Sequence, residues 1–240
     1  MLLYAITNRH LLQPDDPGAP SLAADAEHST RVGTAALISL ARHWAARNID
    51  YIQIREKDLA PDDLRELTRS IVSAVREINQ TTKVLLNGPA QIALAAGADG
   101  IHLPTNAAPN AAAEARALFA QSGREAILSH SCHSIQEVLK IREESQRDPH
   151  ATTTNTLILY APVFEKVLTS PAPNQPPEKL PGQGLEALRA AVHAAGNIPV
   201  LALGGITPEN TPACLAAGAA GIAAIRLFLE EEWTHLRGNA

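Results

Sequence analysis

Three polar side chains at alternate positions, Gln53, Arg55 and Lys57, lie in the stretch YIQIREKDL at residues 51–59, which begins as an apolar run. Side chains two apart on a β-strand share one face, so these groups would point together into the space at the strand's end. A solvated strand end would show the same pattern. The stretch predicts an anion-binding strip and leaves the simpler alternative open.

A glycine pair, Gly204 and Gly205, ends an apolar run in LALGGITPEN at residues 201–210. Glycines let backbone N–H groups approach an anion closely, and the helix expected near Pro208 would add partial positive charge. The next run ends at Ile225 and Arg226. These four residues predict a phosphate site. The alternatives are a plain tight turn at the glycines and an ion pair of Arg226 with Glu230, one helical turn on.

The stretch ILSHSCHSIQEV, residues 127–138, offers proton-transfer chemistry through His130, Ser131, Cys132 and His133. A histidine can carry a proton because its pKa lies near neutrality. A metal site is disfavoured because no acids or further cysteines lie at ligand spacing, and Cys132 reads as a packed thiol. His130 and His133 are the candidate proton carriers, ahead of His102 by position alone. Asn87 either binds a heterocycle or stabilises the turn before Pro89.

Eight short apolar runs alternate with Ala/Leu-rich helical patterns, which predicts α/β architecture as one (β/α)₈ TIM barrel over residues 1–240. An open doubly wound sheet is the competing fold. The runs are 2–7, 51–55, 83–87, 100–104, 126–130, 157–164, 199–205 and 221–225. The expected helices are 33–47, 61–79, 90–96, 109–121, 134–145, 184–195, 208–217 and 226–236. Three stretches break this rhythm: a loop at 9–32, a polar insertion at 146–156 and a Pro-rich loop at 165–183 after the sixth strand.

Composition narrows the function classes. The 20 Lys and Arg residues stand against 25 Asp and Glu residues, a net charge of -5, so no general field attracts nucleic acid or anionic membrane. Aromatic residues make up only 3%, which disfavours base-stacking surfaces. Two cysteines and the lack of a signal-like N-terminus or membrane span favour a reducing cytoplasm.

Five blocks resemble, in order, those of thiamine phosphate synthase and its relative TenI, a thiazole tautomerase. The blocks are YIQIREK, VLLNGPAQIALAAGADGIHLP, SHSCHSIQEV, YAPVFE and IPVLALGGITPENTPACLAAGAAGIAAI. The resemblance covers nearly the whole chain. It implies a (β/α)₈ barrel, often a homodimer, that binds a thiazole phosphate as its small-molecule partner.

The synthase pattern and this chain differ at the metal ligands. The synthase joins the thiazole phosphate to a pyrimidine diphosphate, held by residues matching Gln53, Arg55 and Lys57. Its first Mg²⁺-binding Asp falls where this chain has Gly88, after Asn87, and its second falls near Ala107. The Asn-Gly pair and Ala cannot replace two anionic ligands. Its PVFPTxTK loop reads PVFEKVLTS here.

TenI proteins are more similar at these points, with Asn-Gly, Leu-Pro, and VFE followed by a Gly-x-Gly such as Gly182-Gln183-Gly184. TenI shifts a proton on a thiazole carboxylate phosphate without metal or cofactor, although a proposed base before VFE is replaced here by Pro162. We therefore expect a TenI-like isomerase. Arg55, Lys57, His130 and His133 would be catalytic, and substrate would contact Gln53, Asn87, Ser131, Gly184, Gly204, Gly205, Ile225 and Arg226. The alternatives are a divergent Mg²⁺-dependent synthase and a silent binding protein.

Overall fold

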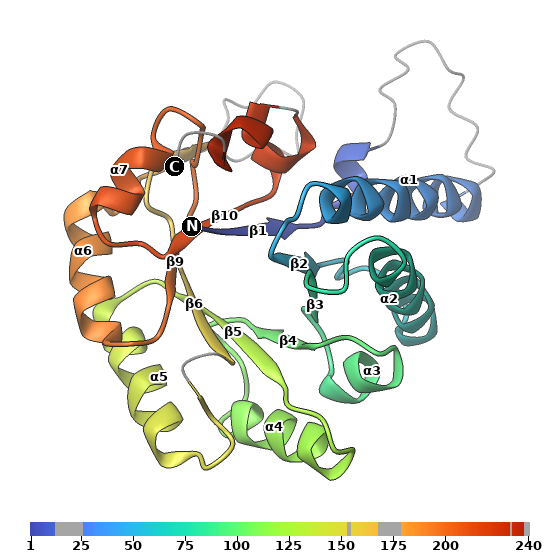
Figure 1. The fold of residues 1–240 in the computed structure, drawn as a ribbon, viewed down its shortest axis with the longest axis horizontal. Coiled ribbons are helices and arrows are strands. Elements are labelled where there is room, and N and C mark those ends of the chain that lie inside the picture. Colours follow the sequence, from blue (N-terminus) through green and yellow to red (C-terminus); the bar gives the residue numbers. More distant parts are fainter. Residues whose placement is uncertain (13–25, 153–154, 168–178, 231, 238–240) are drawn as a thin grey trace.

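Eight parallel strands close into a barrel, with helices around its outside (Figure 1). The structure is a computed structural model that describes residues 1–12, 26–152, 155–167, 179–230 and 232–237. The strand order around the ring is β1-β10-β9-β6-β5-β4-β3-β2. The strands are β1 (Leu2–Ile6), β2 (Tyr51–Ile54), β3 (Lys83–Leu86), β4 (Gly100–Leu103), β5 (Ile127–Cys132), β6 (Thr156–Tyr160), β9 (Val200–Leu203) and β10 (Gly221–Ala224). This ring confirms the predicted TIM barrel over the open sheet.

The helices begin where local chemistry favours them. Pro61 opens the first turn of α2, followed by Asp62 and Asp63. Ser134 caps α5 by accepting a 3.3 Å hydrogen bond from the Glu137 amide, and the Glu137 carboxylate accepts from the Ser134 amide at 3.0 Å. The α-helices are α1 (Ala26–Ala46), α2 (Pro61–Arg76), α3 (Ala90–Ala95), α4 (Ala111–Gln121), α5 (Ile135–Arg147), α6 (Gly184–Ala195) and α7 (Thr211–Ala216).

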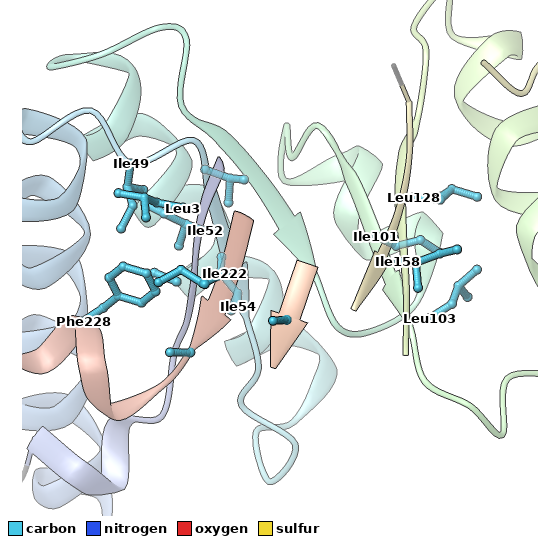
Figure 2. Packing of buried hydrophobic residues seen from close by; sticks show 14 of the residues in the cluster. Leu3, Ile49, Ile52, Ile54, Ile101, Leu103, Leu128, Ile158, Ile222 and Phe228 are labelled. Carbon is cyan, nitrogen blue, oxygen red and sulfur yellow. The ribbon is translucent and has the colours of Figure 1, made fainter. Parts of the chain in front are cut away.

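Side chains alternate between two apolar layers along every barrel strand. The barrel interior is packed by Tyr4, Ile6, Leu85, Leu157, Leu159, Leu201 and Ala223. The layer between strands and helices includes Leu3, Ile52, Ile54, Ile101, Leu103, Leu128 and Ile158, several of which appear in Figure 2. A residue's position in its strand therefore shows whether it faces the interior or the helices.

The irregular stretches differ from the sequence prediction. The 3₁₀ helix η1 (Arg9–Leu12) and the first turns of α1 occupy parts of the predicted loop 9–32, whose residues 13–25 lie outside the described ranges. The Pro-rich loop contributes a short antiparallel pair, β7 (Lys166–Val167) with β8 (Lys179–Leu180). Its residues 168–178 are likewise outside those ranges.

Two 3₁₀ helices replace the predicted final helix. They are η2 (Arg226–Leu229) and η3 (Glu232–Arg237). Phe228 and Trp233 are both buried and pack edge to face with ring centroids 5.3 Å apart. The first of these helices ends before Glu230, whose backbone is extended, so the predicted single helix over 226–236 does not form. No helix in the described ranges is long and apolar enough to cross a lipid bilayer.

Candidate active site

The strip of Gln53, Arg55 and Lys57 begins inside the barrel. Ile52 and Ile54 face the helices, so Gln53 faces the interior, where its Oε1 accepts a 3.1 Å hydrogen bond from the Tyr4 hydroxyl. Arg55 and Lys57 are the next positions of the same parity beyond the strand. Burial lowers the pKa of His102, an interior residue, and the positive charges of Arg55 and Lys57 lower it further. The two cations therefore act on groups at the carboxyl end of the barrel, which is called the mouth below.

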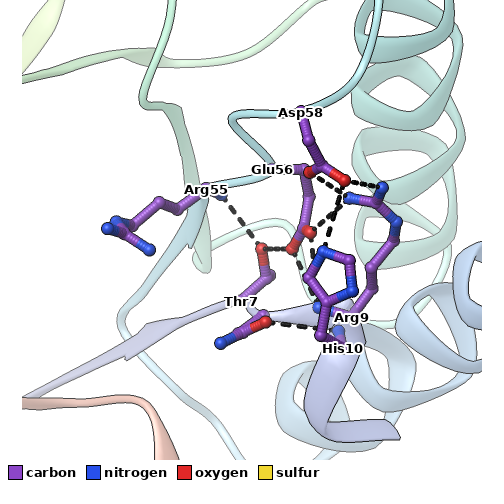
Figure 3. A network of polar contacts seen from close by, with 7 residues as sticks. Thr7, Arg9, His10, Arg55, Glu56 and Asp58 are labelled. Carbon is purple, nitrogen blue, oxygen red and sulfur yellow. Dashed lines mark hydrogen bonds and ion pairs between the residues drawn. The ribbon is translucent and has the colours of Figure 1, made fainter. Parts of the chain in front are cut away.

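A buried ion-pair network fixes the orientation of this strip (Figure 3). Glu56 points the opposite way and accepts hydrogen bonds from Thr7 Oγ1 at 2.6 Å and from Arg9 Nη1 at 2.9 Å. Arg9 also pairs with Asp58, and this guanidinium lowers the pKa of the Asp58 carboxyl to about 2. Thr7 in turn accepts from the Arg55 backbone amide at 3.0 Å. The network ties the ends of β1 and β2 together and leaves the Arg55 side chain on its other side.

A chain of hydrogen bonds crosses the barrel interior below the mouth. The Tyr4 hydroxyl lies 2.7 Å from Ser129 Oγ, which lies 2.9 Å from His102 Nδ1. His102 Nε2 lies 3.0 Å from Ser131 Oγ, toward the rim. Burial lowers the pKa of His102 to about 3, so its imidazole is neutral at pH 7. A neutral ring bonded at both nitrogens can pass a proton between the two serines.

The two predicted proton carriers differ in position, because His130 lies within β5 and His133 follows the end of that strand. Leu128 and Cys132 belong to the layer facing the helices, so His130 between them also faces outward, away from the mouth. His133 has the parity of Ser129 and Ser131 and stands exposed at the rim. Its Nδ1 lies 2.6 Å from the Ala161 carbonyl, which can only accept. This bond assigns the proton to Nδ1 and leaves Nε2 with a lone pair.

The glycine pair is required by close packing. Gly204 and Gly205 have φ of 96° and 64°, and an added Cβ would lie 2.8 Å from Pro162 Cα and 2.7 Å from the Glu165 carbonyl oxygen, respectively. Glycine is therefore needed here whether or not an anion binds. The helix dipole does not reach this turn, because α7 begins only at Thr211.

Backbone N–H groups without an acceptor support an anion site at this turn. Among hydrogen bonds between described residues, none uses the backbone N–H of Gly204, Gly205 or Ile225 as donor. These amides lie at the ends of the neighbouring strands β9 and β10. Arg226 is exposed beside them, and no ion pair joins it to Glu230 in the part of the chain that is described. The alternative of an Arg226–Glu230 ion pair is therefore not found among the described residues.

The two remaining predicted contacts sit on opposite sides of the rim. Asn87 follows β3, is half-buried, and donates its backbone amide to the Ile54 carbonyl at 2.8 Å, next to the cationic strip. Gly184 begins α6 with φ of 85°, and its amide donates to the Val163 carbonyl at 2.9 Å. That amide is thus already satisfied within the protein, whereas the Asn87 side chain has no partner among the described residues.

The described residues do not fit a Mg²⁺ site. Glu56 and Asp58 are bound by Arg9, Glu137 caps α5, and Glu165 pairs with Lys179 at 2.8 Å. Across the described ranges, no three His, Cys, Asp or Glu side chains gather closely enough to hold a metal ion. The positions that follow β3 and β4 carry amides and small side chains instead of carboxylates.

Sequence reasoning missed the residues that organise the mouth. The sequence predicts a loop at Arg9, and it gives Glu56 no role between the cations Arg55 and Lys57. Their pairing joins segments 47 residues apart and leaves no local pattern. Tyr4 and Ser129 did carry a signal, since each is a polar group at an inward position of its strand.

The comparisons with known proteins agree with this architecture. The family model described as thiamine monophosphate synthase, TMP-TENI, matches residues 25–228. A thiamine-phosphate synthase of Methanoculleus marisnigri is 32% identical over 194 residues, covering 80% of both chains. One of Moorella thermoacetica is 32% identical over 188 residues, covering 78% of both.

A solved structure shares the fold. The thiamine phosphate pyrophosphorylase from Pyrococcus furiosus superposes with a TM-score of 0.67 at 24% identity, covering 99% of this chain and 94% of the other. The family match spans most of the sequence, and the two curated relatives exceed 30% identity over more than two thirds of it. This chain therefore belongs to the thiamine monophosphate synthase/TenI family.

Proposed function

We propose that this protein is a metal-independent isomerase that moves a proton on a phosphorylated thiazole carboxylate. The observation that carries the proposal is the state of four carboxylates that follow β2, β5 and β6: Glu56, Asp58 and Glu165 are paired with cations, and Glu137 caps a helix. A transferase expelling pyrophosphate needs its developing charge neutralised, usually by a metal held on free carboxylates. A proton shift needs only an anchor, an acid and a base.

Two anion sites across the mouth would hold the substrate. The unpartnered amides of Gly204, Gly205 and Ile225 suit a phosphate, with the Arg226 guanidinium beside them. Arg55 and Lys57 follow the end of β2, which is three places from β9 around the ring, and they suit the carboxylate. A substrate bearing both groups would be fixed at each end, with its heterocycle over the interior hydrogen-bond chain and Asn87 near its edge.

His133 is the proposed base. Its Nδ1–H is held by the Ala161 carbonyl, so the free Nε2 lone pair can accept a proton from the ring carbon. Ser131, bonded to neutral His102, is placed to return a proton from the other direction. The bond to Ala161 also puts the ring beside Pro162, the position where related isomerases carry their own histidine. His130 has no role in this step because it faces the helices.

The test is an assay with purified, chelator-treated protein and the thiazole carboxylate phosphate, following aromatisation by proton NMR. Turnover unaffected by EDTA supports the proposal. A protein that neither binds nor isomerises this compound overturns it.

A second function, thiamine phosphate synthesis, is favoured by the names of the curated relatives. It predicts release of pyrophosphate from the pyrimidine diphosphate and thiazole phosphate, at a rate that rises with Mg²⁺. Equal rates with and without Mg²⁺ would count against it. The silent-binder alternative predicts binding of the thiazole phosphate without turnover in either assay.

A further inference from the structure

A cavity of about 500 Å³ lies outside the barrel, between α4 and α5 and behind β5. These two helices are neighbours around the ring (Figure 1). The cavity volume lies within the range of small-molecule sites. Part of its wall is apolar, formed by Leu103, Ala107, Ala111, Ala112, Cys132 and Ile141, and the remainder is polar or charged.

Two buried polar groups at this cavity lack partners. Arg116 is 3% exposed; its Nη1 donates to Asp148 at 3.1 Å and its Nη2 to Thr156 at 2.8 Å. The Arg116 Nε–H has no acceptor among the described residues. His130 Nε2 likewise has no hydrogen-bond partner among them. His130 is 5% exposed and lines the cavity from β5. Buried polar atoms without partners are costly, so these two atoms define a place for a missing hydrogen-bonding group. Arg116 Nε–H is a donor, and His130 Nε2 is a donor in the tautomer that carries its proton there.

The charges around the cavity select the acceptor. Burial lowers the pKa of Arg116, which indicates that one carboxylate, Asp148, compensates its charge incompletely. A neutral ligand would leave this deficit. The walls carry three basic side chains, Arg116, Lys140 and Arg147, and three acidic ones, Glu137, Glu144 and Asp148. Because these charges balance, a phosphate dianion would leave a larger excess of negative charge than a monoanion would. A single negative charge on a planar group with two oxygens fits best, one oxygen for each free donor.

We propose that this cavity is a second binding site, separate from the barrel mouth, for a small organic monocarboxylate with an apolar body. One carboxylate oxygen accepts from Arg116 Nε–H and the other from His130 in its Nε2–H tautomer. The apolar part lies against the alanines of α4 and Ile141 of α5. The site does not depend on the reaction proposed at the mouth, because His130 faces the helices from within β5, whereas His133 follows the strand and is exposed.

The experiment titrates isotope-labelled protein with benzoate and with its neutral analogue benzamide, following the His130 ring and Arg116 Nε–H signals by NMR. Inorganic phosphate is kept in excess so that anion sites at the mouth are filled. Benzoate is expected to shift both signals saturably and to leave the His133 ring signal in place. Benzamide is expected to bind at least tenfold more weakly.

A substitution that fills the cavity can be compared with a matched substitution elsewhere on the surface. Ala112→Leu, at the wall, is expected to abolish the benzoate-dependent shifts, whereas Ala190→Leu, on the exposed face of α6, retains them. Absence of saturable shifts in the native protein overturns the proposal, and so does equal binding of benzamide. Unchanged benzoate binding in folded Ala112→Leu overturns it as well. The two native-protein titrations decide the question even if the filled variant does not fold.

Discussion

The proton chemistry proposed at the mouth depends on where each histidine lies relative to β5. His133 reaches the rim with one nitrogen held by a backbone carbonyl, while His130 is turned toward the helices. We expect His133→Ala to lower kcat by about 10²–10⁴-fold, the usual contribution of a positioned acid or base, with little change in KM. His130→Ala should leave kcat within about twofold. Steady-state kinetics would show the assignment to be wrong if the two variants behaved in the opposite way.

Buried neutral histidines also shape stability. Burial lowers the pKa of both His102 and His130 to about 3, against 6.5 in the unfolded chain. Below pH 6.5 the unfolded state takes up protons that the folded state excludes, so stability is complete above that pH and falls toward pH 3.

The loss of stability at acid pH can be measured as the free energy of unfolding in urea between pH 7 and pH 4. Each histidine should contribute a slope of up to about 1.4 kcal/mol per pH unit in the free energy of unfolding. His130→Gln should remove the share of one histidine. An unchanged slope in that variant would mean that His130 is not held neutral in the folded protein.

At the scale of elements, the join between β1 and β2 positions the cationic strip. Arg9 and Glu56 form a buried ion pair with side chains 5% and 1% exposed. Removing one partner leaves the charge of the other buried and uncompensated, so Arg9→Met should lower the free energy of unfolding by about 3–5 kcal/mol. Arg9→Met combined with Glu56→Gln should recover part of this loss. The exposed pair Arg69–Glu66 is the control, since Arg69→Met should cost at most about 1 kcal/mol in the same urea titration.

The turn after β9 is the other element that the site requires. Gly205→Ala would combine a positive φ with a Cβ 2.7 Å from the Glu165 carbonyl oxygen, so the turn and its free amides must move. Gly123→Ala is the matched control, because Gly123 has φ of 74° with no atom within 4 Å. Both should lose about 1 kcal/mol to backbone strain. Only Gly205→Ala should weaken phosphate binding, by tenfold or more in calorimetry; equal affinities would place the phosphate elsewhere.

For the whole molecule, the sequence predicted the barrel well because each strand carries its own apolar signal. The inward direction of Gln53 followed from strand parity alone. The role of Arg9 could not be predicted from the sequence, because it depends on a contact between distant segments. The outward direction of the His130 side chain could not be predicted either. That direction depends on where β5 begins, since a shift of one residue reverses every side chain. The cavity behind β5 arises from how α4 and α5 pack, which no local pattern encodes.

The pairing of β1 with β10 has a consequence for synthesis of the chain. Leu2–Ile6 can pair early with β2, but its other neighbour, Gly221–Ala224, leaves the ribosome only after the seven other barrel strands. Until then both β1 and the last strand made expose an unpaired edge. Ribosome-arrested chains ending before residue 221 should be cut readily by protease and those extending past β10 and its 3₁₀ helices protected. Equal protection of both would show that the ring need not shut for the rest to become compact.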